Sequence, residues 1–496
     1  MNLKRQLSSS TAWMSLAASG MSLVSFLVFI IISRILSPNE IGLVVFAILV
    51  VEAGKIIVNG GITIAVVQRK EWDHTYASTC FYIALLYGTL FTALVFTAGA
   101  ELTHAFYDPA AVPILQTLSV IFLIEAIKVV HEGKLRREFL FKVIALRSIL
   151  ASSISGVVGV ALALQGYGVW ALVAQQLTGQ ILITLITLIS ARWWPRFRFS
   201  LSLAREALGF SSPMMLASLI YTLCNTLLEF MVGIILGPIA LGIYRIAGRA
   251  LFILQDIVIR PMEQTVFPAL ARLSDKPACA DATLRIMRMS CFVIVPIFFG
   301  TAAIAAEFIE LVFGEKWRTS GALMSLLAVG STPLVVRLQV NAALTAQGQS
   351  RWVMFSTAAT LCLTFFIGYF AIPFGLHYAA LAYIAASYLT AMLSLLVFYQ
   401  VFNCTLLAIV KALVPSYLAS GLMLCTCLLV KAELPAHYPD TLRIVLVCFT
   451  GGMIYLLLGL VVFRQETKNF LQEGLNVAPA KFSPWLLRLQ GWLRLQ

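Results

Sequence analysis

Residues 41–66 read IGLVVFAILVVEAGKIIVNGGITIAV, an apolar run in which Glu52 and Lys55 are the only charged side chains. About 20 apolar residues in a helix are enough to cross the roughly 30 Å hydrocarbon core of a bilayer. A helix is required because lipid offers the backbone amides no other hydrogen-bond partner. The run therefore predicts a membrane-spanning helix.

Similar runs recur along the chain of 496 residues, of which 60% are hydrophobic and 11% charged. An ordinary soluble domain has about a quarter of its residues charged, so this composition excludes the soluble class. We predict an all-α integral membrane protein with fourteen transmembrane helices. They are expected near residues 11–33, 41–66, 76–99, 112–130, 143–165, 168–190, 211–236, 240–265, 288–308, 321–344, 352–373, 377–401, 408–430 and 442–463.

The formal net charge of +13 does not indicate a nucleic-acid surface, because the basic residues are scattered between apolar segments. Of the 35 lysines and arginines, 24 are assigned to the side of the membrane that holds the N-terminus and the loops after even-numbered predicted spans, and 5 are assigned to the opposite side. Basic loops stay in the cytoplasm, so both termini are predicted to be cytoplasmic.

The sequence also repeats itself at a shift of 200 residues, most clearly where Leu36, Pro38 and Gly42 recur as Leu236, Pro238 and Gly242. Six helices in each copy make the repeat parallel, and two pseudo-symmetric six-helix lobes are expected around a central cavity. The predicted parts are an N-lobe (1–205), a C-lobe (206–402), two further helices (403–465) and a cytoplasmic tail (466–496). Whether the tail forms an interfacial helix is left open.

The predicted helix 240–265 carries Arg245, Arg249, Asp256, Arg260 and Glu263 at spacings of 4, 7, 4 and 3. These spacings place all five on one stripe of a helix, over about 27 Å. Charges are costly in lipid, so the stripe is expected to face a water-filled cavity. Its excess of arginine favours an anionic guest, because the guanidinium fork donates two hydrogen bonds to a phosphate.

The predicted helix 211–236 carries Asn225 and Glu229 one turn apart, and the predicted helix 321–344 carries Arg337 and Asn341 one turn apart. The predicted substrate-binding set is Arg245, Arg249, Arg260, Arg337, Asn225 and Asn341. A second set serves either as structural ion pairs or as a path for a coupling ion, and consists of Glu52, Lys55, Glu125, Lys128, Glu229, Asp256 and Glu263. Glu52 and Lys55, like Glu125 and Lys128, are close enough in sequence to pair within one helix.

We predict no catalytic residues, because the chain has no phosphate-binding Gly-x-x-x-x-Gly-Lys-Ser/Thr loop and no outer loop long enough for a catalytic domain. The five histidines and nine cysteines lack metal-ligand spacing, so no metal site is expected.

Several motifs together resemble the polysaccharide transport family, the O-antigen and colanic-acid type exporters of the multidrug/oligosaccharidyl-lipid/polysaccharide transporter superfamily. They are Arg34-Ile-Leu-Ser-Pro38 with Gly42, Gly60-Gly61-Ile62, Leu135-Arg136-Arg137-Glu138-Phe139, Gly166-Tyr167-Gly168-Val169-Trp170, Phe267-Pro268-Ala269-Leu270 and Phe313-Gly314-Glu315-Lys316-Trp317.

The resemblance implies a flippase for undecaprenyl-diphosphate-linked oligosaccharide in the bacterial inner membrane, working by alternating access of two lobes. Its partners would be that lipid-linked substrate, membrane lipid, and the polymerase and chain-length proteins of the same pathway, with no nucleic acid. We expect a monomer without a cofactor, driven by an H⁺ or Na⁺ gradient. A drug or cation exporter of the same superfamily is the first alternative, and a polysaccharide polymerase or ligase is the second.

Overall fold

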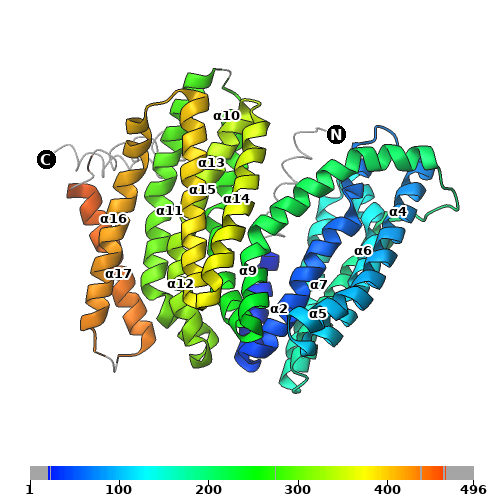
Figure 1. The fold of residues 1–496 in the computed structure, drawn as a ribbon, viewed down its shortest axis with the longest axis horizontal. Helices are drawn as coiled ribbons and strands as arrows, with labels where there is room; N and C mark the ends of the chain where they lie inside the picture. The colour runs from blue at the N-terminus through cyan, green and yellow to red at the C-terminus, as the bar shows by residue number, and fades with distance from the viewer. Residues whose placement is uncertain (1–19, 23, 274, 436–437, 462–463, 465–496) are drawn as a thin grey trace. The chain divides into compact units, whose positions relative to one another are not determined.

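The computed structural model describes residues 20–22, 24–273, 275–435, 438–461 and 464, and these form helices joined by short connections, with no strand among them (Figure 1). The prediction of an all-α membrane protein is confirmed. After a helix at Gly20–Ile35 come α2 (Pro38–Asn59), α3 (Ile62–Gln68), α4 (His74–Leu94), the π-helix η1 (Val95–Gly99), α5 (Ala100–Phe106), the 3₁₀ turn η2 (Pro109–Ala111), α6 (Val112–Arg137), α7 (Phe141–Leu164), α8 (Val169–Ala191) and α9 (Leu201–Val258). Next are α10 (Arg260–Leu270), α11 (Lys276–Phe313), the 3₁₀ turn η3 (Glu315–Trp317), α12 (Arg318–Ser331), α13 (Pro333–Ala346), α14 (Ser350–Ala371), the 3₁₀ turn η4 (Ile372–Phe374), α15 (Leu376–Phe402), α16 (Leu406–Glu433) and α17 (Asp440–Val461).

Twelve helical segments in the described part of the chain are long and apolar enough to cross a membrane. One of them, Leu201–Val258, is 58 residues long and contains the predicted span 211–236 and most of the predicted span 240–265. The two are separated at Gly237, which has a non-helical conformation (φ 82°, ψ −176°). The shorter apolar helix Gly20–Ile35 overlaps the first predicted span, residues 11–33. The total of fourteen stays a prediction, and the predicted tail 466–496 lies outside the described residues.

The start of α2 shows why the Leu-x-Pro motif marks a helix boundary. Ser37 caps the helix: its hydroxyl oxygen accepts a hydrogen bond from the Glu40 backbone N–H at 3.3 Å, and the Glu40 carboxylate accepts from the Ser37 N–H at 2.8 Å. Pro38 follows at the first helical position, where its missing N–H costs nothing. The sequence thus stops one helix and starts the next within three residues.

The predicted helix 41–66 is interrupted. α2 ends at Asn59 and α3 begins at Ile62, because Gly60 and Gly61 adopt positive φ angles of 53° and 71°. Glycine is the residue that takes this conformation without strain, so the pair breaks the helix where the apolar pattern continues unchanged.

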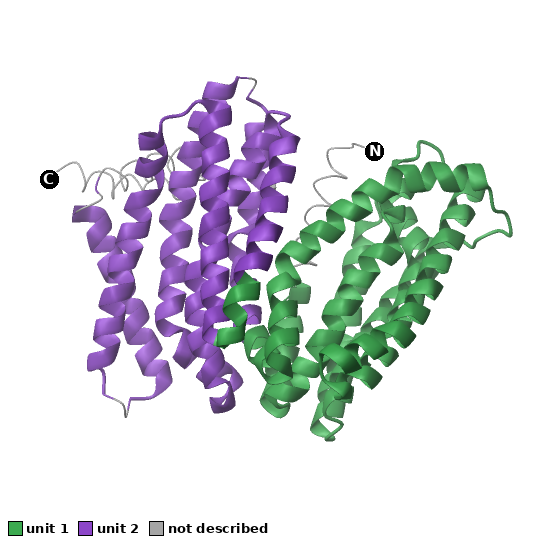
Figure 2. Cartoon of the chain, viewed as in Figure 1, with its two compact units in different colours: residues 1–246, 368–376 green, residues 247–367, 377–496 purple. Residues whose placement is uncertain are grey.

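The chain forms two compact units, shown in green and purple in Figure 2: residues 1–246 with 368–376, and residues 247–367 with 377–496. The dividing point falls inside the continuous second half of α9, so it differs from the predicted lobe boundary at 205/206. The lobe boundaries, which come from the sequence repeat, stay a prediction.

In unit 1, α6 packs against α2, α4 and α8. Glycines allow the close approach: a methyl group added to Gly54 would lie 2.4 Å from the Phe122 ring, and one on Gly88 would lie 2.6 Å from Ala126 Cβ. Small residues at such crossings let membrane helices gain van der Waals contact along their backbones.

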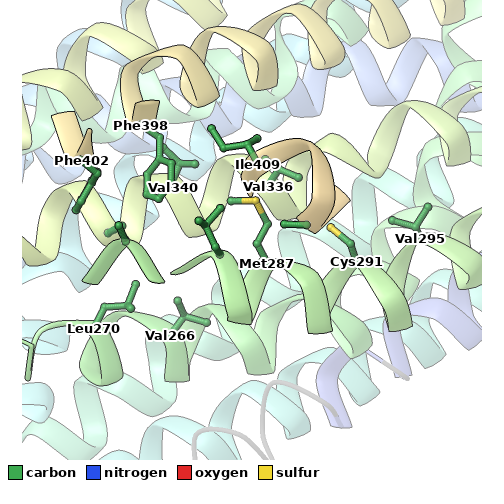
Figure 3. Packing of buried hydrophobic residues seen from close by; sticks show 14 of the residues in the cluster. Val266, Leu270, Met287, Cys291, Val295, Val336, Val340, Phe398, Phe402 and Ile409 are labelled. Atoms are coloured by element: carbon green, nitrogen blue, oxygen red, sulfur yellow. The ribbon is translucent and has the colours of Figure 1, made fainter. Parts of the chain in front are cut away.

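Unit 2 is organised around α11, which packs against α12, α13, α16 and α17. Its buried cluster includes Met287 and Cys291 of α11, Val340 of α13, Phe398 of α15 and Ile409 of α16 (Figure 3). The two helices predicted to stand outside the repeat, α16 and α17, are therefore part of this core.

The two copies of the repeated motif meet in unit 1. A methyl group on Gly42 would lie 1.8 Å from the Pro238 carbonyl oxygen, and one on Gly242 would lie 2.1 Å from the Pro38 carbonyl oxygen. Each copy's glycine thus faces the other copy's proline, the reciprocal pattern that a local two-fold axis produces. This contact supports the repeat inferred from the sequence.

Candidate substrate-binding site

Arg245 is neutralised by a carboxylate on the preceding span. Glu229 and Arg245 lie on either side of the Gly237 turn, eight residues before and after it. The Arg245 Nη1 atom is 3.1 Å from Glu229 Oε1 and 3.0 Å from Oε2, and both side chains are largely buried. Two predicted site residues are therefore ion-pair partners of each other within unit 1.

Asn225 lies one turn before Glu229 on the same segment of α9. Its side-chain amide donates to the Tyr221 carbonyl oxygen of its own helix at 2.8 Å, and the residue is exposed. Its amide oxygen accepts no hydrogen bond from the described residues, which leaves an acceptor on the surface of unit 1.

In unit 2, α9 continues with Arg249 and Asp256. The Arg249 guanidinium lies 5.8 Å from the centre of the Phe252 ring, within range of a cation–π contact. Asp256 accepts from Arg260 across one turn, with a distance of 3.1 Å between Oδ1 and Nη2. Arg260 keeps 47% of its side chain exposed.

The predicted continuous stripe is corrected at one point: the helix does not run unbroken from 240 to 265. α9 ends at Val258 and α10 starts at Arg260, because Pro261 has no N–H to continue the hydrogen-bond ladder. Arg260 and Glu263 therefore belong to α10, a separate helix of 11 residues. The Asp256–Arg260 pair spans the break and keeps the i,i+4 relation on which the stripe was predicted.

Arg337 and Asn341 lie on α13 and turn toward α14. Arg337 Nη1 donates to Thr360 Oγ1 at 3.3 Å, and Asn341 Oδ1 accepts from Ser356 Oγ at 3.4 Å. Both predicted residues therefore bond neutral hydroxyl groups of the same neighbouring helix.

The sequence did not predict a break in the span that contains these residues. Thr332 separates α12 from α13, and Pro333 opens the second segment. Polar contacts gather there: Gln255 Nε2 donates to Ser331 Oγ at 3.1 Å, and Thr332 Oγ1 is 3.2 Å from the Tyr388 hydroxyl. The Ser-Thr-Pro sequence inside an apolar run was the signal that could have located it.

The predicted pairs of unit 1 form as expected within their own helices. Lys55 Nζ is 2.9 Å from Glu52 Oε1, and Lys128 Nζ is 2.7 Å from Glu125 Oε2. Glu125 also accepts from Gln180 of α8 at 2.6 Å. The Glu125 pair is buried and bridges two helices, whereas Glu52 is half exposed.

Unit 1 holds a further buried network that sequence reasoning missed. The Glu132 carboxylate bonds Arg147 of α7 and, at 2.9 Å, Arg136 of α6, while Arg147 also donates to Thr187 of α8. The predicted span ended at residue 130, but α6 continues to Arg137 and carries Glu132 into the packed interior. The spacing of four between Glu132 and Arg136 was the available signal.

Among the described residues, no group of three or more His, Cys, Asp or Glu side chains could hold a metal ion. The charged groups instead form two sets. In unit 1, carboxylates pair with the buried cations Lys128 and Arg147, while in unit 2 Arg337 bonds a hydroxyl group and Arg249 lies beside an aromatic ring.

The sequence pattern of a family described as polysaccharide biosynthesis protein matches residues 31–322. The chain is 26% identical to the succinoglycan biosynthesis transport protein ExoT of Rhizobium meliloti over 318 residues, 64% of each chain. It is 21% identical to the teichuronic acid biosynthesis protein TuaB of Bacillus subtilis over 483 residues, covering 95% of this chain and 99% of that protein.

Two solved structures share the fold. The lipid II flippase MurJ in an inward closed conformation superimposes with a TM-score of 0.75 over 91% of this chain and 98% of that one, at 12% identity. An inward-facing multidrug resistance MATE family transporter of the MOP superfamily superimposes with a TM-score of 0.62 over 79% of this chain and 98% of that one, at 15% identity. The resemblance inferred from the motifs is confirmed, and the relatives support a transporter and not an enzyme.

Proposed function

The chain belongs to the family of polysaccharide biosynthesis proteins, and from that premise we propose that it is a flippase for an oligosaccharide linked to undecaprenyl diphosphate. It would move this building block of a surface polysaccharide across the bacterial inner membrane by alternating access, with an H⁺ or Na⁺ gradient as the drive. Transfer to the polymerase and chain-length proteins of the same pathway would follow.

The observation that carries the proposal is the placement of Arg249, Arg260 and Arg337 on helices within or next to apolar spans of unit 2. A guanidinium stays charged in any environment, and its planar fork can donate two hydrogen bonds to a phosphate. Arg337 bonds a hydroxyl, and Arg260 keeps half of its side chain exposed beside Asp256. A diphosphate supplies the charge and the paired oxygens that such groups bind best.

The direct test is transport by the purified protein in vesicles. A fluorescent lipid diphosphate bearing a short oligosaccharide is placed in both leaflets, and a membrane-impermeant reductant reports how much of it crosses. We expect Arg249→Ala and Arg260→Ala each to slow crossing at least tenfold, since one charge-assisted hydrogen bond contributes about 1.5–3 kcal/mol. Arg318→Ala, which removes an arginine at the start of α12, is the matched control and should transport normally.

Two outcomes would contradict the proposal. Crossing at the normal rate in both arginine variants would remove the role of the stripe. Transport of a cationic dye, with no crossing of the lipid diphosphate, would favour the drug-exporter alternative.

A further inference from the structure

A short segment that the transport proposal does not use connects α8 to α9. Residues 192–200 read RWWPRFRFS, and within them Arg192, Arg196 and Arg198 alternate with aromatic residues, without any acidic side chain. The segment follows directly on the membrane span Val169–Ala191. It therefore lies at the boundary between hydrocarbon and water.

The backbone of this segment is fixed to the start of α4. The Arg196 N–H donates to Ser78 Oγ at 2.9 Å, the Ser200 N–H donates to Thr79 Oγ1 at 3.2 Å, and the Tyr82 hydroxyl donates to the Arg196 carbonyl oxygen at 3.3 Å. Trp193 is buried, and its indole N–H donates to His74 Nδ1 at 3.3 Å. The segment is thus held by backbone groups and by one inward-facing tryptophan.

Its other side chains point outward. Trp194 is 71% exposed, Phe197 101% and Phe199 56%, and the three arginines are exposed as well. Folding gains nothing from leaving three aromatic rings uncovered in this way, so an external apolar environment has to cover them. Aromatic rings are enriched where membrane and water meet, because their apolar and polar parts suit that zone.

We propose that residues 192–199 form a binding surface for the anionic headgroups of phospholipids in the leaflet that this segment borders. Trp194, Phe197 and Phe199 enter the interfacial zone, and the guanidinium groups of Arg192, Arg196 and Arg198 bind lipid phosphates. The nearest acidic residue in the sequence, Glu206, pairs with Arg69 at 3.3 Å. Among the described residues the three arginines form no ion pair, so their guanidinium groups are available to the lipid. The proposal needs only that the chain spans a membrane, and it does not depend on what the chain transports.

The test compares lipid classes on the full-length protein. Purified protein is titrated with phosphatidylglycerol or phosphatidylcholine, and bound lipids are counted by native mass spectrometry. Each basic residue near an anionic surface strengthens binding about fivefold, so Arg196→Gln with Arg198→Gln should weaken phosphatidylglycerol binding roughly 25-fold. The backbone bonds of Arg196 stay available in this variant. Lys316→Gln with Arg318→Gln, an equal loss of charge in the η3–α12 region, is the control and should stay within about twofold of the wild type.

Two readouts on the intact sequence keep the proposal testable if the double variant does not fold. Binding of phosphatidylglycerol to the wild type should weaken strongly when salt is raised from 0.1 M to 1 M, since the Debye length falls from about 10 Å to 3 Å. Quenching of tryptophan fluorescence by lipids brominated near the headgroup should be smaller in Trp194→Phe. Equal affinity for both lipid classes, salt-independent binding, or unchanged phosphatidylglycerol affinity in the folded double variant would each overturn the proposal.

Discussion

The Glu132–Arg147 ion pair of unit 1 and the Asp256–Arg260 ion pair of unit 2 differ in how far they are buried. In unit 1, Glu132 and Arg147 bond each other between α6 and α7, and both side chains are under 10% exposed. In unit 2, Arg260 pairs with Asp256 while about half of its side chain remains open. A closed pair holds helices together, whereas an open cation can exchange its partner for a ligand. The comparison therefore separates charges that stabilise the fold from charges available for function.

Removing the Glu132 carboxylate should produce the largest loss of stability. In Glu132→Ala, Arg147 stays charged because an arginine cannot lose its proton, and its remaining described partner is the Thr187 hydroxyl. Leaving one member of a buried pair costs about 3–5 kcal/mol. We expect unfolding of the purified variant in mixed micelles to show a loss of this size.

The double variant Glu132→Leu with Arg147→Met is the control for this prediction. Apolar residues of similar volume often replace a buried ion pair at no cost, so most of the lost stability should return. If the double variant is as unstable as Glu132→Ala, then charge balance is not what makes this pair important.

A smaller loss of stability is expected for an ion pair of unit 2 that, like Glu132–Arg147 in unit 1, joins two helices. Lys431 of α16 is 2.7 Å from Glu307 of α11 and also donates to the Ala303 carbonyl oxygen at 3.1 Å. Lys431→Met removes the ion pair of Glu307, but Lys431 is 23% exposed whereas Arg147 is 5% exposed, so we expect a smaller loss, of about 2 kcal/mol. The same unfolding measurement checks it, and a loss as large as that of Glu132→Ala would remove the distinction between the two pairs.

The sequence predicted the spans well, because a run of apolar residues is a direct consequence of hydrocarbon as solvent. It also located the turn between the two spans of α9, since the Leu-x-Pro-x-x-x-Gly motif recurs there. The breaks at Gly60–Gly61, at Ile259 and at Thr332 were not predicted. The apolar run continues through Gly60–Gly61 and Thr332, and membrane helices tolerate Pro and Gly, so the pattern alone could not distinguish these breaks from a continuous helix. At Ile259 the charges that follow, Arg260 and Glu263, were assigned to the polar stripe of one continuous helix.

The candidate site was predicted as a list of residues, without their partners. The spacing on one helix places Arg245 and Arg260 on a stripe, and it also indicates the Glu52–Lys55 and Glu125–Lys128 pairs. It contains nothing about neighbours on other helices, so the Arg245–Glu229 pair and the Arg337–Thr360 bond could not be derived. The Glu132–Arg147 pair was missed for a similar reason, because its members lie on different helices and Glu132 falls beyond the predicted span end at residue 130.

Arg260 gives the clearest contrast between stability and function. Arg260→Gln removes an ion pair whose arginine is 47% exposed, and ion pairs that solvent reaches contribute about 0–1 kcal/mol. We therefore expect unfolding close to that of the wild type, together with at least a tenfold loss of lipid-diphosphate transport in vesicles. A stability loss above about 2 kcal/mol would place Arg260 with the structural charges of unit 1.

The smallest change in stability is expected for Glu52→Gln. This variant tests whether every ion pair of unit 1 is structural. Glu52 pairs with Lys55 one turn away at 2.9 Å, but its side chain is 51% exposed, unlike Glu125, which is buried against Lys128 and Gln180. An i,i+3 pair of this kind contributes about 0.2–0.5 kcal/mol, so the unfolding of the variant should be almost unchanged. Transport then separates the two interpretations left open for this residue. A transport rate equal to that of the wild type makes the Glu52–Lys55 pair structural. A loss of the dependence of transport on the ion gradient, with stability intact, makes Glu52 a coupling residue. In that case the exposure of a charged side chain, and not the unit to which it belongs, decides whether it serves transport.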